Sequence, residues 1–468
     1  MALSAVQRDE SDSAHFLTRL QPLHDSFMAG KTRDIEWRKS QLNALLKLVT
    51  DNEDAIAEAL RSDLGKCYAE AFTSEIGYVQ ADIRHTLSHL KKWIARVKVS
   101  TPVVAQPGSS YRLPEPLGTV LIIGAWNYPF QLTIAPYIAA LAAGNCAVLK
   151  PSELAAHTSS LIASLIPKYM DSSAVQVIEG GKDETSALLS LKWDHIFYTG
   201  GEAVGKIVMR AAAEHLTPVT LELGGKSPCI VDSKTNLEVT ARRIAWGKWM
   251  NAGQTCIAPD YVLVERQFAE PFIDALRHAI EEQYGKTPLT SSDYGTIINE
   301  RHFSRLMRYL DGVNIVYGGE VDASARKLSP TIVLDPPVDS TLMQEEIFGP
   351  VLPVVFIDSK ADAIKFVTNR PKPLALYLFT EDEDFEEDVT GQTSSGNMCI
   401  NDTMMFMLNQ ELPFGGVGTS GMGNYHGKAG FDTFSHLKTV MKRSFWFDVS
   451  IRYAPFKSWK LKLLKKML

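Results

Sequence analysis

Short apolar segments alternate with segments of helical pattern from residue 118 onwards, and this alternation constrains the fold more than any other feature. The strand candidates are 119–123, 147–149, 175–178, 195–198, 219–223 and 229–231. Short apolar strands separated by helices are typical of parallel βαβ units. The chain is therefore predicted to be α/β with an open sheet, in which ligands bind beyond the carboxyl ends of the strands.

A second alternating series follows residue 256. The segments 261–265 and 351–356 suit strands, and 268–284 suits a helix. A chain of 468 residues is also too long for one simple core. We therefore predict two open α/β domains rather than one.

The flanking segments have other patterns. Up to about residue 95, apolar residues recur at helical spacing, as in Leu42, Leu45 and Val49, which indicates a packed helical layer. The Pro- and Ser-rich segment 100–116 suits a connection or an edge strand, and 434–440 suits a strand that returns after a Gly-rich loop.

Composition excludes several classes of function. Hydrophobic residues at 45% and charged residues at 22% are ordinary for a globular protein, and 48 basic against 54 acidic residues argue against nucleic-acid binding. Five cysteines without a Cys-x-x-Cys pattern favour a reducing compartment. The eleven histidines form no ligand cluster in the sequence, so no metal site is predicted. The absence of an apolar signal or of a spanning stretch predicts a cytoplasmic protein.

Two short segments carry groups suited to covalent catalysis. Residues 220–226 form an apolar strand that ends in Glu222 and a Gly pair, and residues 251–256 form a small-residue turn that ends in Cys256. A thiol nucleophile requires a polarised setting and a group that can move protons. By itself, Cys256 could equally be an inert buried cysteine, and Glu222 a carboxylate that caps the Gly turn.

Glu222 in Leu-Glu-Leu-Gly-Gly-Lys, followed by Cys256 in Gly-Gln-Thr-Cys, resembles the signature pair of NAD(P)-dependent aldehyde dehydrogenases. The resemblance extends over nearly the whole chain, and the run 412–418 followed by 423–428 resembles the class 3 branch, which includes fatty-aldehyde dehydrogenases. Four further stretches match the family in the same order: 124–130, 150–153, 199–205 and 345–350.

The resemblance implies a mechanism. The Cys256 thiolate would add to the aldehyde carbonyl, and the Asn127 amide with the Cys256 backbone N–H would stabilise the oxyanion. After hydride transfer to the nicotinamide, Glu222 would activate water to hydrolyse the thioester. Without the resemblance, Asn127 would be an ordinary turn residue before Tyr128-Pro129.

The resemblance also implies a site for NAD, with NADP as a second cofactor. A carboxylate at Glu153, paired with Lys150, would bind the adenosine ribose and repel a 2′-phosphate, which favours NAD. A helix that begins near residue 202 would point N–H groups at a phosphate. The remaining cofactor contacts implied are Trp126, Gly200, Gly201, Val204, Gly205, Glu346 and Phe348.

Apolar residues near the two catalytic segments suggest the substrate. By analogy with the family, a tunnel to Cys256 would be lined by Tyr128, Trp249, Met250, Met404 and Phe406. Such walls favour a long-chain, aromatic, isoprenoid or polyene aldehyde over a charged one. Ordinary core packing is the alternative interpretation of these residues.

The expected organisation follows the family. Residues 1–95 and 114–222 would form a Rossmann-like cofactor domain, and residues 223–400 the catalytic domain. Residues 96–113 and 401–445 would form a small β element for oligomerisation, which implies a homodimer. The tail 446–468 has aromatic residues at its start and an amphipathic helical end, with Lys460 interrupting the apolar half, which suggests peripheral membrane contact or a cover for the tunnel mouth.

Three other functions remain open at this point. A coenzyme A-acylating dehydrogenase would transfer the thioester instead of hydrolysing it, and Glu222 argues against this. A thiol hydrolase would not use the nicotinamide motifs. A non-catalytic structural relative would not require Cys256, Glu222 and Asn127 together.

Overall fold

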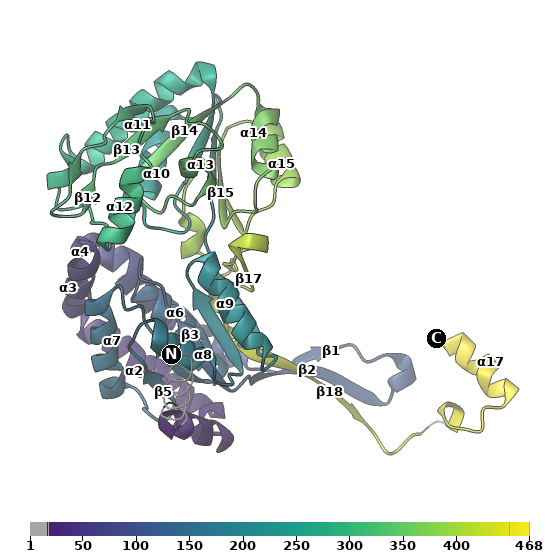
Figure 1. Cartoon of the computed structure of the whole chain (residues 1–468). Helices are drawn as coiled ribbons and strands as arrows, with labels where there is room; N and C mark the ends of the chain where they lie inside the picture. Colours follow the sequence, from purple (N-terminus) through teal and green to yellow (C-terminus); the bar gives the residue numbers. More distant parts are fainter. Residues whose placement is uncertain (1–15, 17, 449, 468) are drawn as a thin grey trace, which may run out of the picture.

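The computed structural model describes residues 16, 18–448 and 450–467. Residues 1–15, which the sequence assigns to the cofactor domain, and Leu468, assigned to the apolar half of the tail, lie outside the described residues. Two α/β bodies lie one above the other in Figure 1, and a long arm projects from the lower body. The α/β class predicted from the alternating pattern is confirmed.

The first sheet has six strands in the order β17-β7-β6-β3-β4-β5, and all but β17 are parallel. The chain adds β4 and β5 on one side of β3, and then adds β6 and β7 on the other side. The carboxyl ends of β3 and β6 therefore flank a crevice suited to a ligand. The strands are β3 (Thr119–Ile123), β4 (Cys146–Lys150), β5 (Val175–Val177), β6 (His195–Thr199), β7 (Val219–Glu222) and β17 (Gly421–Met422). The crossover helices are α6 (Gln131–Ala143), α7 (Ala156–Tyr169), α8 (Lys182–Leu189) and α9 (Glu202–Ala213).

The strands of this sheet are apolar throughout because both faces are covered. In β3, Val120 and Ile122 face the larger core, whereas Leu121 and Ile123 face a second core on the other side. The larger core includes most of the predicted helical layer, whereas a helix over residues 18–28 packs through Leu20 and Leu23 into the second core. That layer consists of η1 (Lys31–Arg33), α2 (Ile35–Asp51), α3 (Glu53–Leu64), α4 (Tyr68–Ala71), η2 (Phe72–Ile76) and α5 (Gly77–Trp93).

The second sheet has seven strands in the order β10-β13-β14-β9-β8-β15-β16, and β10 alone is antiparallel to its neighbour. The segment 229–231 lies here as part of β8 rather than in the first sheet. The strands are β8 (Pro228–Val231), β9 (Tyr261–Glu265), β10 (Ile315–Tyr317), β13 (Thr331–Leu334), β14 (Val351–Ile357), β15 (Ala375–Phe379) and β16 (Asn397–Ile400).

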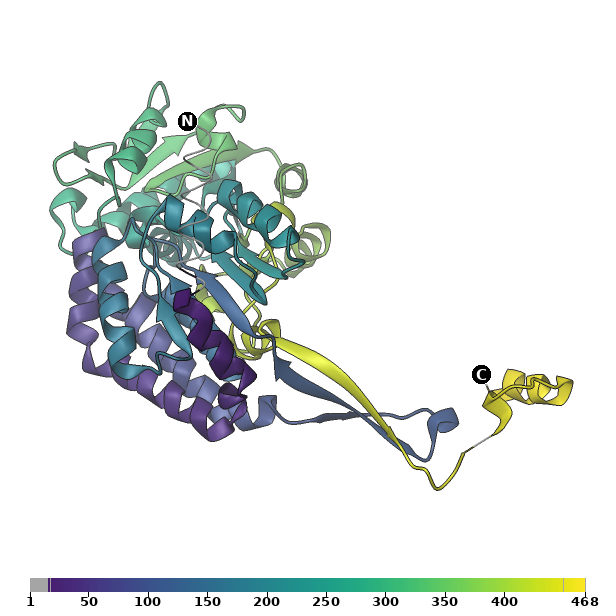
Figure 2. The same cartoon turned by 60° about the horizontal axis from the view of Figure 1, so that its bottom comes forward.

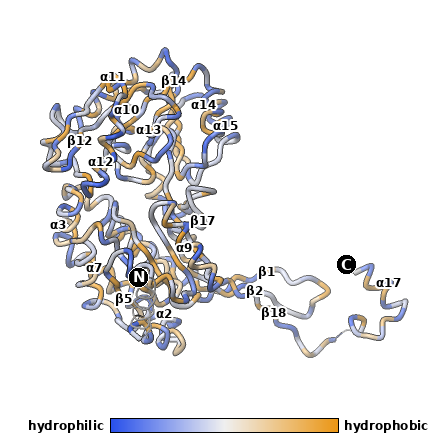
Figure 3. Tube along the Cα trace, viewed as in Figure 1, coloured by the Kyte–Doolittle hydropathy of each residue, from blue (hydrophilic) through white to orange (hydrophobic). Residues whose placement is uncertain are grey.

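Helices cover this second sheet, and a small hairpin of β11 (Val321–Asp322) and β12 (Lys327–Leu328) lies beside it. Figure 3 shows hydrophobic and hydrophilic stretches alternating along the trace in both bodies. The helices are α10 (Leu237–Trp249), α11 (Ala269–Tyr284), α12 (Glu300–Arg308), α13 (Thr341–Gln344), α14 (Lys360–Thr368) and α15 (Glu383–Gln392). The short helices are η4 (Met250–Gly253), η5 (Arg266–Phe268), η6 (Pro288–Thr290), η7 (Met405–Leu408) and η8 (Gly418–Ser420).

The arm is a sheet in the order β1-β2-β18, built from β1 (Val97–Val99), β2 (Gly108–Pro116) and β18 (Ser435–Arg443), with η3 (Val103–Ala105) at its tip. β18 pairs with β2 of the same chain along its whole length. α16 (Gly427–Thr433) leads into β18, and η9 (Ser450–Arg452) and α17 (Ser458–Met467) follow it. Figures 1 and 2 both show the arm extending away from the body, with α17 near its far end.

Candidate active site

A strained turn carries Cys256 between α10 and β9. Asn251, Ala252 and Gly253 all have positive φ, at 54°, 50° and 74°. A Cβ on Gly253 would lie 2.2 Å from the Gly349 carbonyl oxygen, so only glycine fits there. Left-handed backbone at two non-glycine residues costs about 1–3 kcal/mol each and persists only where the surroundings enforce it. Such strain is typical of positions that hold a reactive side chain.

The Asn127 side chain lies against this turn. Its Nδ2 donates to the Gln254 carbonyl oxygen at 3.0 Å, and Asn251 Nδ2 donates to the Asn127 carbonyl oxygen at 2.8 Å. An amide nitrogen has two hydrogens, so Asn127 keeps a second donor for a reacting oxygen. Tyr128, which follows, shares a hydrogen bond of 2.6 Å between its hydroxyl and Thr255 Oγ1. The segment after β3 and the Cys256 turn are thus joined by several short contacts.

A buried ion pair between Lys66 and Glu75 holds the backbone of the segment that follows β3. Lys66 and Glu75 are both inaccessible to solvent, and Lys66 Nζ donates to Glu75 Oε1 at 2.5 Å. Lys66 Nζ also donates to the Asn127 carbonyl oxygen at 3.1 Å and lies 3.9 Å from the centre of the Tyr128 ring. Glu75 Oε2 accepts from the backbone N–H of Phe130 at 2.9 Å. The pair therefore determines where the Asn127 backbone lies.

Glu222 ends β7 and is 2% exposed. Neither of its carboxyl oxygens has a hydrogen-bond partner among the residues that the structure describes. Burial without partners disfavours the charged form and raises the pKa of Glu222 well above its usual range. The alternative interpretation, in which Glu222 caps the Gly turn, has no support among the hydrogen bonds of the described residues. A buried carboxyl without hydrogen-bond partners is suited to accept and release a proton during a reaction.

Cys256 is partly exposed, whereas Cys146 and Cys229 are buried, and all five cysteines are free. Burial is the main cause that raises the pKa of the Cys256 thiol, and the Glu346 and Glu222 carboxyls add to it. The backbone N–H groups of Cys256 and Ile257 act in the opposite direction. The thiol is therefore neutral at rest and must lose its proton to a base before it can attack.

The crevice beyond β6 and β7 fits a dinucleotide phosphate. Gly200 has φ of 158°, and its N–H donates to the Glu222 carbonyl oxygen at 2.9 Å, which brings β6 and β7 together. Gly201 caps α9, and a Cβ built on it would meet nothing within 4 Å. Gly205 lets α9 approach the sheet, because its Cβ would lie 2.8 Å from Leu223 Cδ2. Val204, the fourth residue expected here, is exposed.

An open cavity of about 660 Å³ lies between the two sheets at this crevice. It is lined by Glu202 at the start of α9, by Gly224 and Gly225 after β7, and by Glu346. Burial, then the Asp260 carboxylate, raises the pKa of Glu346 to about 8, and Glu346 Oε1 has no partner. A carboxyl that lines an open cavity and has an unpartnered oxygen suits a ribose hydroxyl, so these residues fit the cofactor expected from the sequence.

The other expected cofactor residues fall into two groups. Trp126 and Phe348 pack edge to face with ring centres 5.2 Å apart, and Phe348 has a positive φ of 47°. Lys150 is buried at the end of β4, and its Nζ donates to Glu153 Oε2 at 3.0 Å while half of the Glu153 side chain is exposed. The predicted Lys150–Glu153 pair is thus present as an ion pair, and the ribose-binding role stays a prediction.

The expected tunnel residues are all wholly or partly buried, in different settings. Trp249 is 1% exposed, and its Nε1 donates to the Pro350 carbonyl oxygen, which favours packing. Phe406 stacks between Tyr377 and Phe414 at 6.3 and 6.2 Å, with Met404 buried just before it and Met250 half-buried at the Cys256 turn. This aromatic column supports an apolar wall near the thiol.

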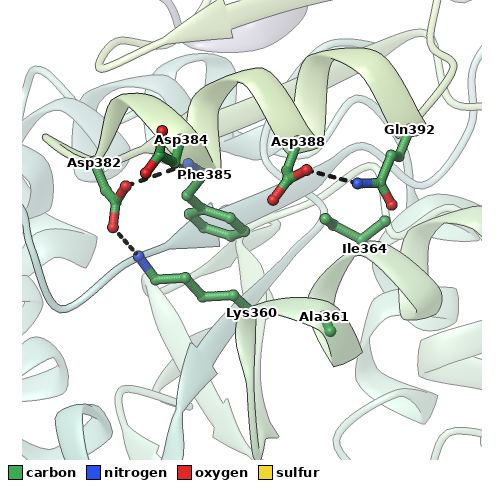
Figure 4. A pocket seen from close by; sticks show the side chains of 8 residues that line it. All are labelled: Lys360, Ala361, Ile364, Asp382, Asp384, Phe385, Asp388 and Gln392. Carbon is green, nitrogen blue, oxygen red and sulfur yellow. Dashed lines mark hydrogen bonds and ion pairs between the residues drawn. The ribbon is translucent and has the colours of Figure 1, made fainter.

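A smaller cavity of about 380 Å³ lies far from this chemistry, between α14 and α15 (Figure 4). Lys360 on one wall donates to Asp382 Oδ2 at 2.9 Å and also to Asp232. On the other wall, Asp388 accepts from Gln392. These polar groups are bonded to one another, so the cavity contributes nothing to the site.

Several site residues have no signal in the sequence. Lys66 and Glu75 resemble ordinary solvated helix charges in the sequence, yet both are fully buried. Tyr377 and Tyr425 are buried tyrosines within electrostatic reach of Cys256. They come from distant segments, and only the packing of the sheets and the loop before α16 brings them to the thiol.

Comparisons with known proteins agree with this geometry. Residues 20–440 match the aldehyde dehydrogenase family. The chain is 49% identical over 451 residues to an aldehyde dehydrogenase of Craterostigma plantagineum, covering 95% of this chain and 94% of the relative. It is 48% identical over 461 residues to aldehyde dehydrogenase family 3 member H1 of Arabidopsis thaliana, covering 97% and 95%.

A mammalian relative and a solved structure extend the likeness. The dimeric NADP-preferring aldehyde dehydrogenase of Canis lupus familiaris is 46% identical over 438 residues, covering 93% of this chain and 97% of the relative. The substrate-bound structure of Staphylococcus aureus AldH has a TM-score of 0.94 and 46% identity, covering 96% of this chain and 99% of that one. The chain belongs to the aldehyde dehydrogenase family, in its family 3 branch, and is an NAD(P)-dependent enzyme that oxidises an aldehyde to its acid.

Proposed function

We propose that Cys256 forms the covalent intermediate of this oxidation. The observation that carries the proposal is the contact between the Asn127 amide and the Cys256 turn, beside the unpartnered Glu222 carboxyl. The Cys256 thiol first releases its proton to solvent water. The resulting thiolate adds to the aldehyde carbon, and the carbonyl oxygen becomes an oxyanion that the second Asn127 N–H can bond. Removing one oxyanion donor costs about 10²–10³ in kcat in a comparable site.

Glu222 acts in the second half of the reaction. When bound, the nicotinamide cofactor supplies the hydride acceptor that oxidises the covalent adduct. The Glu222 carboxylate then takes a proton from water, the resulting hydroxide attacks the thioester carbonyl, and the C–S bond breaks to release the acid. The proton acquired by Glu222 leaves to solvent before the next cycle. A raised pKa suits a base that must accept a proton near neutral pH.

The cofactor would lie across the crevice of the first sheet. Gly200, Gly201 and the first turn of α9 would hold the phosphates, and Lys150 with Glu153 the adenosine ribose. Trp126, Glu346 and Phe348 would hold the nicotinamide end. The exposed Glu153 carboxylate would repel a 2′-phosphate, so NAD is the proposed cofactor and NADP the weaker one, although the canine relative is NADP-preferring.

The proposed substrate is a hydrophobic aldehyde of the long-chain, aromatic, isoprenoid or polyene type. The wall formed by Tyr128, Met404 and Phe406 offers apolar surface and few charged partners. The test is production of reduced nicotinamide from a panel of short, long-chain, aromatic and polyene aldehydes with each cofactor. The Cys256→Ser variant should show no turnover. Turnover of short aldehydes alone would refute the substrate proposal, and turnover by Cys256→Ser would refute the mechanism.

The same assay separates the rival reactions. An acylating dehydrogenase would require coenzyme A for turnover and would release an acyl thioester, whereas the proposed enzyme releases the free acid without coenzyme A. A thiol hydrolase would gain no protection from thermal unfolding by NAD+. A non-catalytic relative would show no turnover with any aldehyde.

We further propose that the chain forms a homodimer through its arm. An isolated ribbon of few strands is marginally stable in water, and the arm extends away from the body that could cover it (Figure 2). Leu437 and Met441 lie on one face of β18 and are 38% and 53% exposed. A second copy of the chain is the proposed occupant, in line with the dimeric state named for the canine relative.

The tail 446–468 is proposed to contact a membrane surface. No helix among the described residues is long and apolar enough to cross a bilayer. Trp446, Phe447, Trp459 and Leu461 are exposed, and Lys460 turns back to donate to the Ser450 and Tyr453 carbonyl oxygens. Truncation after Arg452 should abolish sedimentation with anionic liposomes while leaving turnover of a water-soluble aldehyde intact. Unchanged sedimentation would leave only the tunnel-cover alternative.

A further inference from the structure

Two histidines on α5 and a glutamate on a distant loop lie together outside the active site. His85 and His89 are one helical turn apart, and their rings stack with centres 4.2 Å apart. Glu411 lies between η7 and α16, and its Oε1 is 4.0 Å from His85 Nε2. One ligand atom from each of the three residues lies within 4.8 Å of the others. The active site described above uses none of them.

The hydrogen bonds around the two rings leave nitrogen lone pairs available. His85 Nε2 is buried and has no hydrogen-bond partner within the described part of the chain, which is costly for a polar atom. His89 Nδ1 lies 2.9 Å from the His85 carbonyl oxygen and 2.8 Å from Ser88 Oγ. The Ser88 hydroxyl donates its own hydrogen to the His85 carbonyl oxygen at 2.7 Å, so both neighbours of Nδ1 can accept and the proton resides on Nδ1. The lone pair of His89 then resides on Nε2. A histidine that donates its other N–H to a backbone carbonyl is typical of metal ligands.

We propose that His85, His89 and Glu411 bind a divalent transition-metal ion of the zinc type. Two histidines at i and i+4 present both rings on one helix face, and a carboxylate completes a set of two nitrogens and one oxygen. In a tetrahedral zinc site, ligand bonds of about 2.0–2.1 Å separate the ligand atoms by roughly 3.4 Å. The present ligand atoms lie up to 4.8 Å apart and the two rings are stacked. Binding therefore requires rotation of the imidazole rings together with movement of the largely exposed Glu411 carboxylate, which closes the separations by up to roughly 1.4 Å.

The bound ion would join two parts of the molecule that bear on the substrate wall. Glu411 follows the run Met404–Leu408, which contains Phe406 of the aromatic column. α5 also carries Tyr78, whose hydroxyl is 2.8 Å from His426 Nε2, and His426 stacks on Phe414. A metal ion that links α5 to the Glu411 loop would therefore fix the position of this wall at a second point. The gain would be thermal stability of the loop rather than chemistry on the aldehyde.

The test is titration of Zn²⁺ into the chelator-treated full-length chain by calorimetry, with Cys256→Ser as the parent because the reactive thiol can itself bind zinc. One ion should bind per chain, and His89→Ala or Glu411→Gln should each lower the affinity at least about tenfold. His278→Ala, which removes an exposed histidine on α11, should leave it unchanged. The midpoint of thermal unfolding should rise with Zn²⁺ in the parent and in His278→Ala only.

Equal zinc affinity in the parent, His89→Ala and Glu411→Gln would overturn the proposal, as would no binding by the parent at millimolar zinc. Because every protein in this experiment lacks the Cys256 thiol, its outcome is independent of whether the proposed catalytic mechanism holds.

Discussion

At the scale of single residues, the site combines groups whose pKa values are shifted from their usual range. Burial raises the pKa of both the Glu222 carboxyl and the Cys256 thiol, and the two groups raise each other's energy when both are charged. The reaction requires both to release a proton in turn. The pH dependence of each half-reaction is therefore the most direct probe of the arrangement.

Glu222→Gln should separate the two halves of the reaction. Glutamine keeps the shape of the side chain but cannot accept the proton from water, so the thioester should accumulate. We expect a burst of about one reduced nicotinamide per active site, followed by a steady rate lower by about 10²–10⁴. Rapid-mixing absorbance measures both phases. Glu214→Gln, at an exposed position after α9, should behave like the wild type. A wild-type steady rate in Glu222→Gln would exclude it as the base.

Glu346→Gln should make the Cys256 thiol more acidic. A carboxylate near the thiol opposes the thiolate, and Glu346, with a pKa of about 8, is charged in the alkaline range where the thiol ionises. Removing this charge lowers the pKa of the thiol, so the pH profile of its alkylation should shift to lower pH. Mass spectrometry of the Cys256 peptide after timed iodoacetamide treatment gives the profile. Glu345→Gln, at the neighbouring position, is the control. An equal shift of the alkylation profile in both variants would contradict the assignment of the effect to Glu346.

Lys66→Met should destabilise the protein and slow turnover. The change leaves Glu75 buried without its cation, which costs about 3–5 kcal/mol. It also removes the donor that holds the Asn127 carbonyl, so kcat should fall even below the unfolding temperature. Thermal unfolding and steady-state kinetics measure the two effects. Lys91→Met on the exposed side of α5 should change stability by less than about 0.5 kcal/mol. Equal unfolding midpoints of Lys66→Met and Lys91→Met would show that the Lys66–Glu75 ion pair does not stabilise the fold.

At the scale of elements, the start of α9 illustrates two different uses of glycine. Gly205 is needed for packing against Leu223, whereas the space over Gly201 is open and its φ of −75° suits any residue. Packing within the chain explains the first glycine. The second is explained only if something else occupies the open space, which is where the cofactor phosphates are proposed to lie.

Alanine at these two positions should therefore have opposite consequences. Gly205→Ala should lower stability by about 1–3 kcal/mol through overpacking. Gly201→Ala should melt like the wild type without cofactor but lose most of the protection that NAD+ confers, with an affinity about tenfold lower. Thermal unfolding across NAD+ concentrations tests both. Full protection of Gly201→Ala by NAD+ would show that α9 does not hold the phosphates.

At the scale of the whole molecule, the exposed face of the arm is the proposed interface with a second copy of the chain. The double variant Leu437→Asp/Met441→Asp should turn a dimer into a monomer, because it places charges on the exposed apolar face of β18. His436→Asp, on the opposite face of the same strand, should remain dimeric. Sedimentation velocity at micromolar concentration distinguishes the two states. A dimeric double variant would place the interface elsewhere.

The strands of the first sheet and the α/β class follow from the local pattern, because short apolar runs between helices have few other folds available. The chemical identity of the site also follows from local motifs: a thiol after a Gly-rich turn and a carboxylate at a strand end are both visible in the sequence. The same local pattern underestimates the length of the arm, because the pairing of β2 with β18 joins segments that are separated by most of the chain.

The α/β class, the parallel strands of the first sheet and the residue types at the ends of β3, β6 and β7 can thus be predicted from the amino-acid sequence alone. Which distant groups come together depends on packing: Lys66 and Glu75 contact the Asn127 segment, Tyr377 and Tyr425 lie around Cys256, and Glu411 lies beside His85. The physical reason is that backbone conformation depends on neighbouring residues, whereas the burial and partners of a charge depend on which faces pack together.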